Sequence, residues 1–316
     1  MGKRFTKPNN LFFFTTFGAN GIGLRASDGT ELNSNQYFML YEQTTLNCRG
    51  QLLDLSTPIV MGILNTTPDS FFAGSRVENE KTLLQRAERM ITEGSSILDI
   101  GGMSSRPGAA IIEESEEMRR VLPAIEAVKK AFPSAIISID TIRASVARAA
   151  VEAGASIVND ISAGNLDALM FQMVADLGTP YILMHMKGTS KTMQQSAIYE
   201  DVTLEVLDFF IEKIGILRGL GVKDVVVDVG FGFGKTLEQN YELLRKLNIF
   251  KILDCPILAG LSRKTMIWKA LDSTPDNALN GTTAANMLAL MGGAKILRVH
   301  DVREAVEAIK IFNAYN

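Results

Sequence analysis

The sequence has little of several features that define common protein classes. Its 316 residues include two cysteines, Cys48 and Cys255, which lie far apart and outside any CxxC pair. This argues against a disulfide framework or a structural zinc site and fits a reducing compartment. It also has no apolar stretch long enough to span a bilayer. We therefore expect a cytoplasmic protein without a membrane partner.

Strong charge of one sign is also missing. The formal net charge is −3, and charged residues make up 21% of the chain. A balance this close to neutral argues against a nucleic-acid partner held by a basic surface, although it allows a local cationic pocket. Hydrophobic residues reach 47%, which is enough for a sizeable core.

Residues 1–43 differ in composition from the rest. They are rich in Asn, Gly, Thr and Phe and show no sustained helical period. We interpret them as an N-terminal extension, partly disordered. The stretch Gly18–Gly23 resembles a dinucleotide-binding loop, but without a clear strand before it and a helix after it the interpretation fails.

From residue 44 to residue 316 the pattern is regular and predicts one domain. Eight short apolar runs occur: Ile59–Leu64, Ser96–Ile100, Ala135–Ile139, Ser156–Val158, Tyr181–Met184, Val225–Val227, Pro256–Ala259 and Lys295–Val299. Each ends in polar or glycine residues and lacks internal polar alternation, as expected for strands buried on both faces.

Segments with helical periodicity lie between these runs, and examples are Lys81–Thr92, Glu114–Ala131, Arg143–Ala153, Val202–Arg218, Glu238–Leu247 and Thr282–Met291. Regular alternation of strands and helices predicts a parallel sheet, and eight units favour a closed α/β (β/α)8 TIM barrel over an open sheet. We expect Leu46–Leu55 to form a short hairpin that covers the barrel floor.

The active site of such a barrel lies at the carboxyl ends of its strands. The polar residues found there are Asn65, Asp99, Asp140, Asn159 with Asp160, His185, Asp228, Ser262 to Lys264, and Arg298 with His300. Lys264, Arg298 and Arg106 supply cations for phosphate oxygens. Asp140, Asp228 and Asn159 supply acceptors. The ring therefore predicts a ligand with an anionic tail and a head rich in N–H donors.

Two other patterns are interpreted as structural features. The segment Gly230–Thr236 resembles a Walker A loop, but Val229 stands where that motif needs its first glycine. Its three glycines instead predict a tight turn beside a ligand. The acidic run Glu113–Glu117 is interpreted as a solvated helix start.

At these strand ends the sequence resembles the dihydropteroate synthase family over nearly all of residues 44–316. The motifs that carry the resemblance are Met61–Phe71, Asp99–Gly108, Ser138–Thr141, Val158–Ile161, Leu183–His185, Asp228–Lys235, Ser262–Lys264 and Arg298–His300. Each motif is short, but eight in the family's order, each at its own strand end, are specific.

The resemblance implies a TIM barrel, usually a homodimer, that condenses a dihydropterin pyrophosphate with p-aminobenzoate in folate biosynthesis. It implies Mg2+ as the metal and sulfonamides as competitors of p-aminobenzoate. It assigns pterin binding to Asp140, Asn159, Met184, Asp228, Phe233 and Lys264. It assigns pyrophosphate binding to Asn65, Arg298 and His300, with Asn65 also on the metal, and p-aminobenzoate binding to Ser105, Arg106, Pro107 and Thr265. Catalysis would fall to Asp140, Lys264, Arg298 and His300.

Two positions depart from the family pattern. Ala73 stands where a loop carboxylate is usual, and Val229 stands where a proline usually follows the strand-end Asp228. These departures keep two alternatives open: a pterin-binding paralogue with weak or no synthase activity, and a pterin-dependent methyltransferase of the same barrel family.

Overall fold

A computed structural model describes residues 14–18, 21–25, 43–66, 76–103, 112–188 and 197–316. The chain divides into two compact units, residues 1–41 and 42–316. In the first, β1 (Phe14–Gly18) and β2 (Gly21–Arg25) form an antiparallel hairpin, which the sequence does not predict. Because a strand and no helix follows Gly18, the dinucleotide loop is excluded. The predicted disorder of residues 1–43 falls mostly on residues outside the described ranges.

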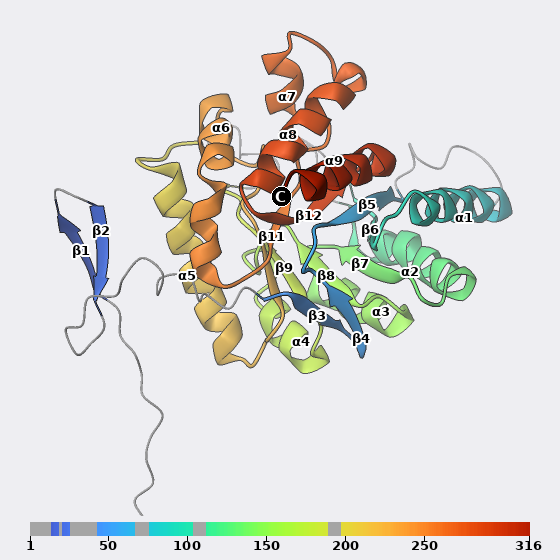
Figure 1. Cartoon of the computed structure of the whole chain (residues 1–316). Coiled ribbons are helices and arrows are strands. Elements are labelled where there is room, and N and C mark those ends of the chain that lie inside the picture. Colours follow the sequence, from blue (N-terminus) through green and yellow to red (C-terminus); the bar gives the residue numbers. More distant parts are fainter. Residues whose placement is uncertain (1–13, 19–20, 26–42, 67–75, 104–111, 189–196) are drawn as a thin grey trace, which may run out of the picture. The chain divides into compact units, whose positions relative to one another are not determined.

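The second unit is a closed parallel barrel, as predicted (Figure 1). Around the barrel the order is β10-β11-β12-β5-β6-β7-β8-β9. The strands are β5 (Ile59–Asn65), β6 (Ile97–Gly101), β7 (Ile136–Asp140), β8 (Ile157–Asp160), β9 (Tyr181–Met184), β10 (Val225–Asp228), β11 (Ile257–Ala259) and β12 (Ala294–Val299). The first and last residues of each strand lie within two residues of the bounds of the corresponding predicted run.

Helices cover the outside of the barrel, between successive strands and, for α9, after the last strand (Figure 1). They are α1 (Arg76–Thr92), α2 (Glu114–Ala131), α3 (Ala144–Ala153), α4 (Met170–Leu177), α5 (Val202–Gly219), α6 (Leu237–Arg245), α7 (Thr265–Ala270), α8 (Leu279–Met291) and α9 (Val302–Tyr315), with 3-10 turns η2 (Leu247–Leu253) and η3 (Pro275–Asn277). The sequence analysis did not name the segments that form α4, α7 and α9.

Side chains alternate along each strand between the barrel interior and the helices. At the floor every barrel strand contributes one apolar side chain to a single buried cluster: Met61, Ile97, Ile136, Ile157, Ile182, Val226, Leu258 and Ile296. The predicted hairpin, β3 (Thr45–Cys48) and β4 (Gln51–Asp54), closes this end by adding Leu46, Cys48 and Leu53. The interior is therefore packed at the floor, and any site must lie at the other end.

One minor prediction is wrong. The acidic run at the start of α2 is not entirely solvated, because Glu117 is fully buried. Its carboxylate accepts hydrogen bonds from the Thr141 hydroxyl (2.6 Å) and from Arg143. The charge is therefore paired inside the protein, as buried carboxylates require.

Candidate active site

Strand alternation decides which of the polar strand-end residues enter the barrel. Asn65, Gly101, Asp140 and Asn159 are neighbours in strand register across β5, β6, β7 and β8. Gly101 leaves room for its neighbour, since a Cβ there would lie 3.3 Å from the Asp140 Cβ. Asp160, one residue further on, points the other way and accepts a hydrogen bond from the Tyr181 hydroxyl at 2.8 Å. Asp160 is therefore a structural residue of the outer layer.

Arg298, on β12, joins two carboxylates from other strands. Its Nε donates to Asp99 Oδ2 at 2.7 Å, and its Nη2 donates to Asp140 Oδ2 at 2.6 Å. Asn159 Nδ2 donates to the same Asp99 oxygen at 3.2 Å. The other oxygen, Asp99 Oδ1, is buried and has no hydrogen-bond partner among the described residues. One cation thus serves two carboxylates in the barrel interior.

Burial controls the electrostatics of this group. It raises the pKa of Asp140 to about 7, because the loss of solvent and the repulsion from Asp99 outweigh the attraction of Arg298. Burial alone would lower the pKa of Arg298, but Asp99 and Asp140 together raise it above its ordinary value. The guanidinium therefore stays charged, while burial favours the neutral form of Asp140.

On the opposite side of the mouth, Asp228 at the end of β10 faces Lys264 at the start of α7. Burial raises the pKa of Asp228, and Lys264 opposes that rise. Burial likewise lowers the pKa of Lys264 to about 8, against the attraction of Asp228. Lys264 Nζ lies 4.7 Å from the centre of the Phe233 ring, and Phe233 packs with Met184 in a small apolar cluster. This wall offers a flat apolar surface beside charged groups.

The loop that carries Phe233 is held by Lys235, a residue that the sequence interpretation overlooked. Lys235 is buried, and its Nζ donates to the carbonyl oxygens of Gly230 (2.9 Å) and Phe233 (3.0 Å) and lies 3.0 Å from His185 Nδ1. Burial lowers the pKa of Lys235 to about 7. Burial, followed by the charge of Lys235, lowers the pKa of His185 to about 2. The sequence feature that could have identified this residue is its place directly after the three glycines of the segment Gly230–Gly234.

Glycine is required in this loop. Gly230 has φ +69°, and a Cβ there would lie 1.9 Å from the His185 carbonyl oxygen. Gly230 also donates from its backbone nitrogen to Asp228 Oδ1 at 2.8 Å. A side chain at this position would therefore displace both the loop and the carboxylate. The predicted tight turn is present.

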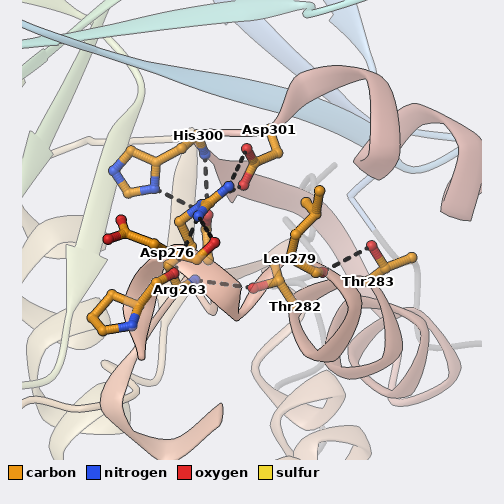
Figure 2. Close-up of polar contacts among 9 residues, drawn as sticks. Arg263, Asp276, Leu279, Thr282, Thr283, His300 and Asp301 are labelled. Atoms are coloured by element: carbon orange, nitrogen blue, oxygen red, sulfur yellow. Dashed lines mark hydrogen bonds and ion pairs between the residues drawn. The ribbon is translucent and has the colours of Figure 1, made fainter. Parts of the chain in front are cut away.

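The ends of β11 and β12 are linked at the rim (Figure 2). Ser262 Oγ lies 3.0 Å from His300 Nδ1 and accepts a hydrogen bond from the His300 backbone nitrogen at 3.2 Å. Arg263 donates from Nε and Nη2 to the two Asp301 carboxylate oxygens, each at 2.9 Å. His300 itself is exposed, so its ring lies at the surface of the mouth.

The predicted site residues fall into three groups. Facing one another at the mouth are Asp140, Asn159, Met184, Asp228, Phe233, Lys264 and Arg298. At its rim lie Asn65, at the end of β5, and the exposed His300 and Thr265. Ser105, Arg106 and Pro107, as well as Ala73, lie outside the described residues. Asp99 received no role from the sequence, yet it holds Arg298.

No cluster of three or more His, Cys, Asp or Glu side chains suited to a metal ion occurs among the residues that the structure describes. Among these residues Asn65, at the end of β5, carries an amide oxygen of the kind that a hard cation accepts as a ligand. Within the same described ranges, no helix has the length and hydropathy to cross a membrane.

Comparisons with known proteins agree on one family. A model described as pterin binding enzyme matches residues 61–300. The dihydropteroate synthase of Escherichia coli K12 is 44% identical over 275 residues, covering 85% of this chain and 95% of that protein. The crystal structure of Yersinia pestis dihydropteroate synthase with a sulfonamide drug complex superposes with TM-score 0.80 at 42% identity, covering 86% of this chain and 98% of that one. The Xanthomonas albilineans synthase with 4-aminobenzoic acid also reaches 0.80, at 40% identity and the same coverage.

Proposed function

Because this chain belongs to the pterin-binding enzyme family and, within it, to the dihydropteroate synthases of folate biosynthesis, we propose how its barrel mouth works as a transferase. The reaction joins 6-hydroxymethyl-7,8-dihydropterin pyrophosphate to p-aminobenzoate and yields 7,8-dihydropteroate and pyrophosphate. The observation that carries the proposal is the interior placement of Asp140, Asn159 and Asp228 around one opening, with Arg298 and Lys264 beside them.

The pterin head binds in the barrel mouth. Its ring N–H and amino groups are donors, and Asp140, Asn159 and Asp228 present acceptor oxygens from three strands. Met184 and Phe233 supply an apolar surface for the ring. Lys264 sits over Phe233 and donates to the backbone carbonyl of Phe231, so it lines the same wall. Binding in one pose replaces much of the entropy that a bimolecular encounter would lose.

The pyrophosphate end then faces Arg298, His300 and Asn65. The C–O bond to pyrophosphate breaks, and its electron pair leaves with the pyrophosphate. The positive charge left on the pterin methylene is delocalised into the ring and is stabilised by the carboxylates of Asp140 and Asp99. Arg298 and His300 stabilise the departing negative charge. Fixed groups of this kind lower a barrier because they need no reorganisation.

Mg2+ fits this site as an ion that arrives with the substrate. It usually keeps several waters and takes one or two protein oxygens together with phosphate oxygens. Asn65 would supply the amide oxygen. When bound, the ion adds positive charge at the leaving pyrophosphate.

The p-aminobenzoate amine is nucleophilic when neutral, so the site requires no strong base. Its nitrogen forms the new bond to the methylene carbon and then loses a proton to solvent. Thr265, which is exposed at the start of α7, would contact this substrate. Ser105, Arg106 and Pro107 would complete its pocket. We expect sulfonamides to compete there with p-aminobenzoate.

A coupled assay of pyrophosphate release tests the proposal. Release should require both substrates and Mg2+, and chelation should stop it. A folded sample that releases none would contradict the synthase activity. Calorimetric binding of the pterin without turnover would instead support the paralogue. Methyl transfer from a methylated tetrahydrofolate would support the methyltransferase.

Two further properties belong to the proposal. We expect a homodimer. Leu271, just after α7, and Leu288 and Met291, on α8, are exposed and offer apolar surface for a second copy. Light scattering over a range of concentrations would measure the mass. We also expect a cytoplasmic location, which suits two cysteines that are buried and unpaired.

A further inference from the structure

The link between Ser262 and His300 specifies more than the position of the ring. The Ser262 hydroxyl has one hydrogen, and its oxygen accepts the His300 backbone N–H at 3.2 Å. The same oxygen lies 3.0 Å from His300 Nδ1. Among the described residues, Ser262 Oγ has no hydrogen-bond partner other than His300. Nδ1 is therefore the one acceptor that the described residues offer to this hydrogen.

A neutral imidazole that accepts at Nδ1 carries its hydrogen on Nε2. This tautomer suits an anion, because pyrophosphate oxygens only accept hydrogen bonds. The other tautomer would present an Nε2 lone pair to the same oxygens and repel them. The choice of tautomer at His300 thus decides whether the ring attracts or repels the leaving group.

The next residue, Arg263, is held by contacts with Asp301, Asp276 and Thr282 (Figure 2). Arg263 adopts a positive φ of 54°, which is uncommon for a residue with a side chain. Two parallel hydrogen bonds from the Arg263 guanidinium to the Asp301 carboxylate, called here the Arg263–Asp301 fork, hold this conformation. Arg263 Nη1 also donates to the carbonyl oxygens of Pro275 (3.1 Å) and Asp276 (2.9 Å). The Arg263 backbone nitrogen donates to Thr282 Oγ1 at 3.1 Å. Since Asp301 directly follows His300, this fork fixes the loop after β11 against the end of β12.

We infer that Ser262 is a positioning residue that keeps His300 in the Nε2–H tautomer, so that the ring meets the pyrophosphate as a neutral hydrogen-bond donor. The Arg263–Asp301 pair maintains the register on which this depends. The functional part of the inference rests on the proposed function, whereas the tautomer itself is a property of the free protein.

The chain allows a direct measurement, because it contains only two histidines. The full-length protein would be labelled with 15N-histidine and studied at about pH 8.5, above the ordinary imidazole pKa. A His300→Gln variant identifies the signals of His300 by their loss. We expect the wild-type spectrum to show a protonated Nε2 and a bare Nδ1 at His300. A protonated Nδ1, or an even mixture of tautomers, would overturn the inference.

Ser262→Ala should shift the two nitrogen signals of His300 toward each other, because both tautomers become populated. It should weaken binding of Mg2+-pyrophosphate in calorimetry by about 2- to 10-fold, the range expected for one hydrogen bond. Ser262→Thr keeps the hydroxyl and should restore most of both effects. Ser56→Ala makes the same change at the other end of the barrel, next to Asp54, and should change neither. Thermal melting confirms that each variant folds.

The outcomes separate the inference from the proposed function. A wild-type protein with a protonated Nε2 but no turnover and no pyrophosphate binding would leave the tautomer standing and refute the function. Turnover together with a protonated Nδ1 would refute the inference alone. Unchanged pyrophosphate affinity and an unchanged spectrum in Ser262→Ala would show that the hydroxyl does not control the ring.

Discussion

The floor and the mouth of this barrel are built from the same eight strands with the same alternation, yet their interiors differ in kind. At the floor the inward side chains form one apolar cluster, closed by Leu46 and Leu53 of the hairpin. At the mouth, Asp99, Asp140 and Arg298 share the interior, with Asp228 and Lys264 opposite. Buried charge is costly even when it is paired, whereas buried apolar surface is stabilising. The floor therefore stabilises the fold, whereas the charged groups that function requires at the mouth make the fold less stable.

The largest effect should come from Arg298→Ala. It removes the cation that faces the leaving pyrophosphate, so we expect kcat/KM to fall by about 10²- to 10³-fold, the loss typical of one stabilising group. The pyrophosphate-release assay measures it. Arg298→Lys keeps a positive charge but loses the planar guanidinium, and it should retain more activity than Arg298→Ala. A rate within about twofold of wild type in Arg298→Ala would contradict the assignment.

Leu46→Ala tests the opposite end. Leu46 is fully buried in the floor cluster, and the cavity should lower the free energy of unfolding by about 3 kcal/mol. Urea denaturation measures this change. Leu52→Ala removes a neighbouring but exposed leucine and should cost less than about 0.5 kcal/mol. If Leu46→Ala changes kcat/KM in protein that remains folded, floor and mouth are not independent.

Lys235→Met should change how stability depends on pH. The pKa of Lys235 falls to about 7 on folding, so between about pH 7 and 10.5 the unfolded chain binds more protons than the folded chain. Stability from this group therefore rises with pH across that window, by at most about 1.4 kcal/mol per pH unit. The variant loses this slope, so its stability relative to wild type should decrease between pH 7.5 and 9.5. Denaturation at both values measures it, and a constant difference would contradict the lowered pKa of Lys235.

Asp140→Asn should give the smallest change in stability, and we expect that change to be a gain. The pKa of Asp140 rises to about 7 on folding, so its ionised form opposes folding as pH increases from about 4 to 7. At pH 8 the amide should make the protein more stable by about 1 kcal/mol, while turnover is lost. Calorimetric melting at pH 5 and pH 8 measures the gain, which should be smaller at pH 5. A loss of stability at pH 8 would show that the pair with Arg298 outweighs burial.

The strands could be predicted because each is a short apolar run, and Tyr181–Met184 was predicted with its observed bounds. Asp99 lay in a recognised motif, but its link to Arg298 joins residues 199 positions apart. No local pattern carries such a contact. Glu117 had the same problem, because a charge at a helix start looks solvated until Arg143 is placed beside it. The short α4 and α7 contain too few turns for a clear helical period.

By itself, the sequence determined the order of strands and helices, the polar character of the strand ends and the motifs of the family. These depend on side-chain type and on spacing along the chain, which local physics can interpret. Only the tertiary structure decided which polar side chains face inward, which carboxylates share Arg298, and how Lys235 and Ser262 hold the groups beside them. Those choices depend on barrel closure, which brings distant residues into contact and removes the water that would otherwise separate their charges.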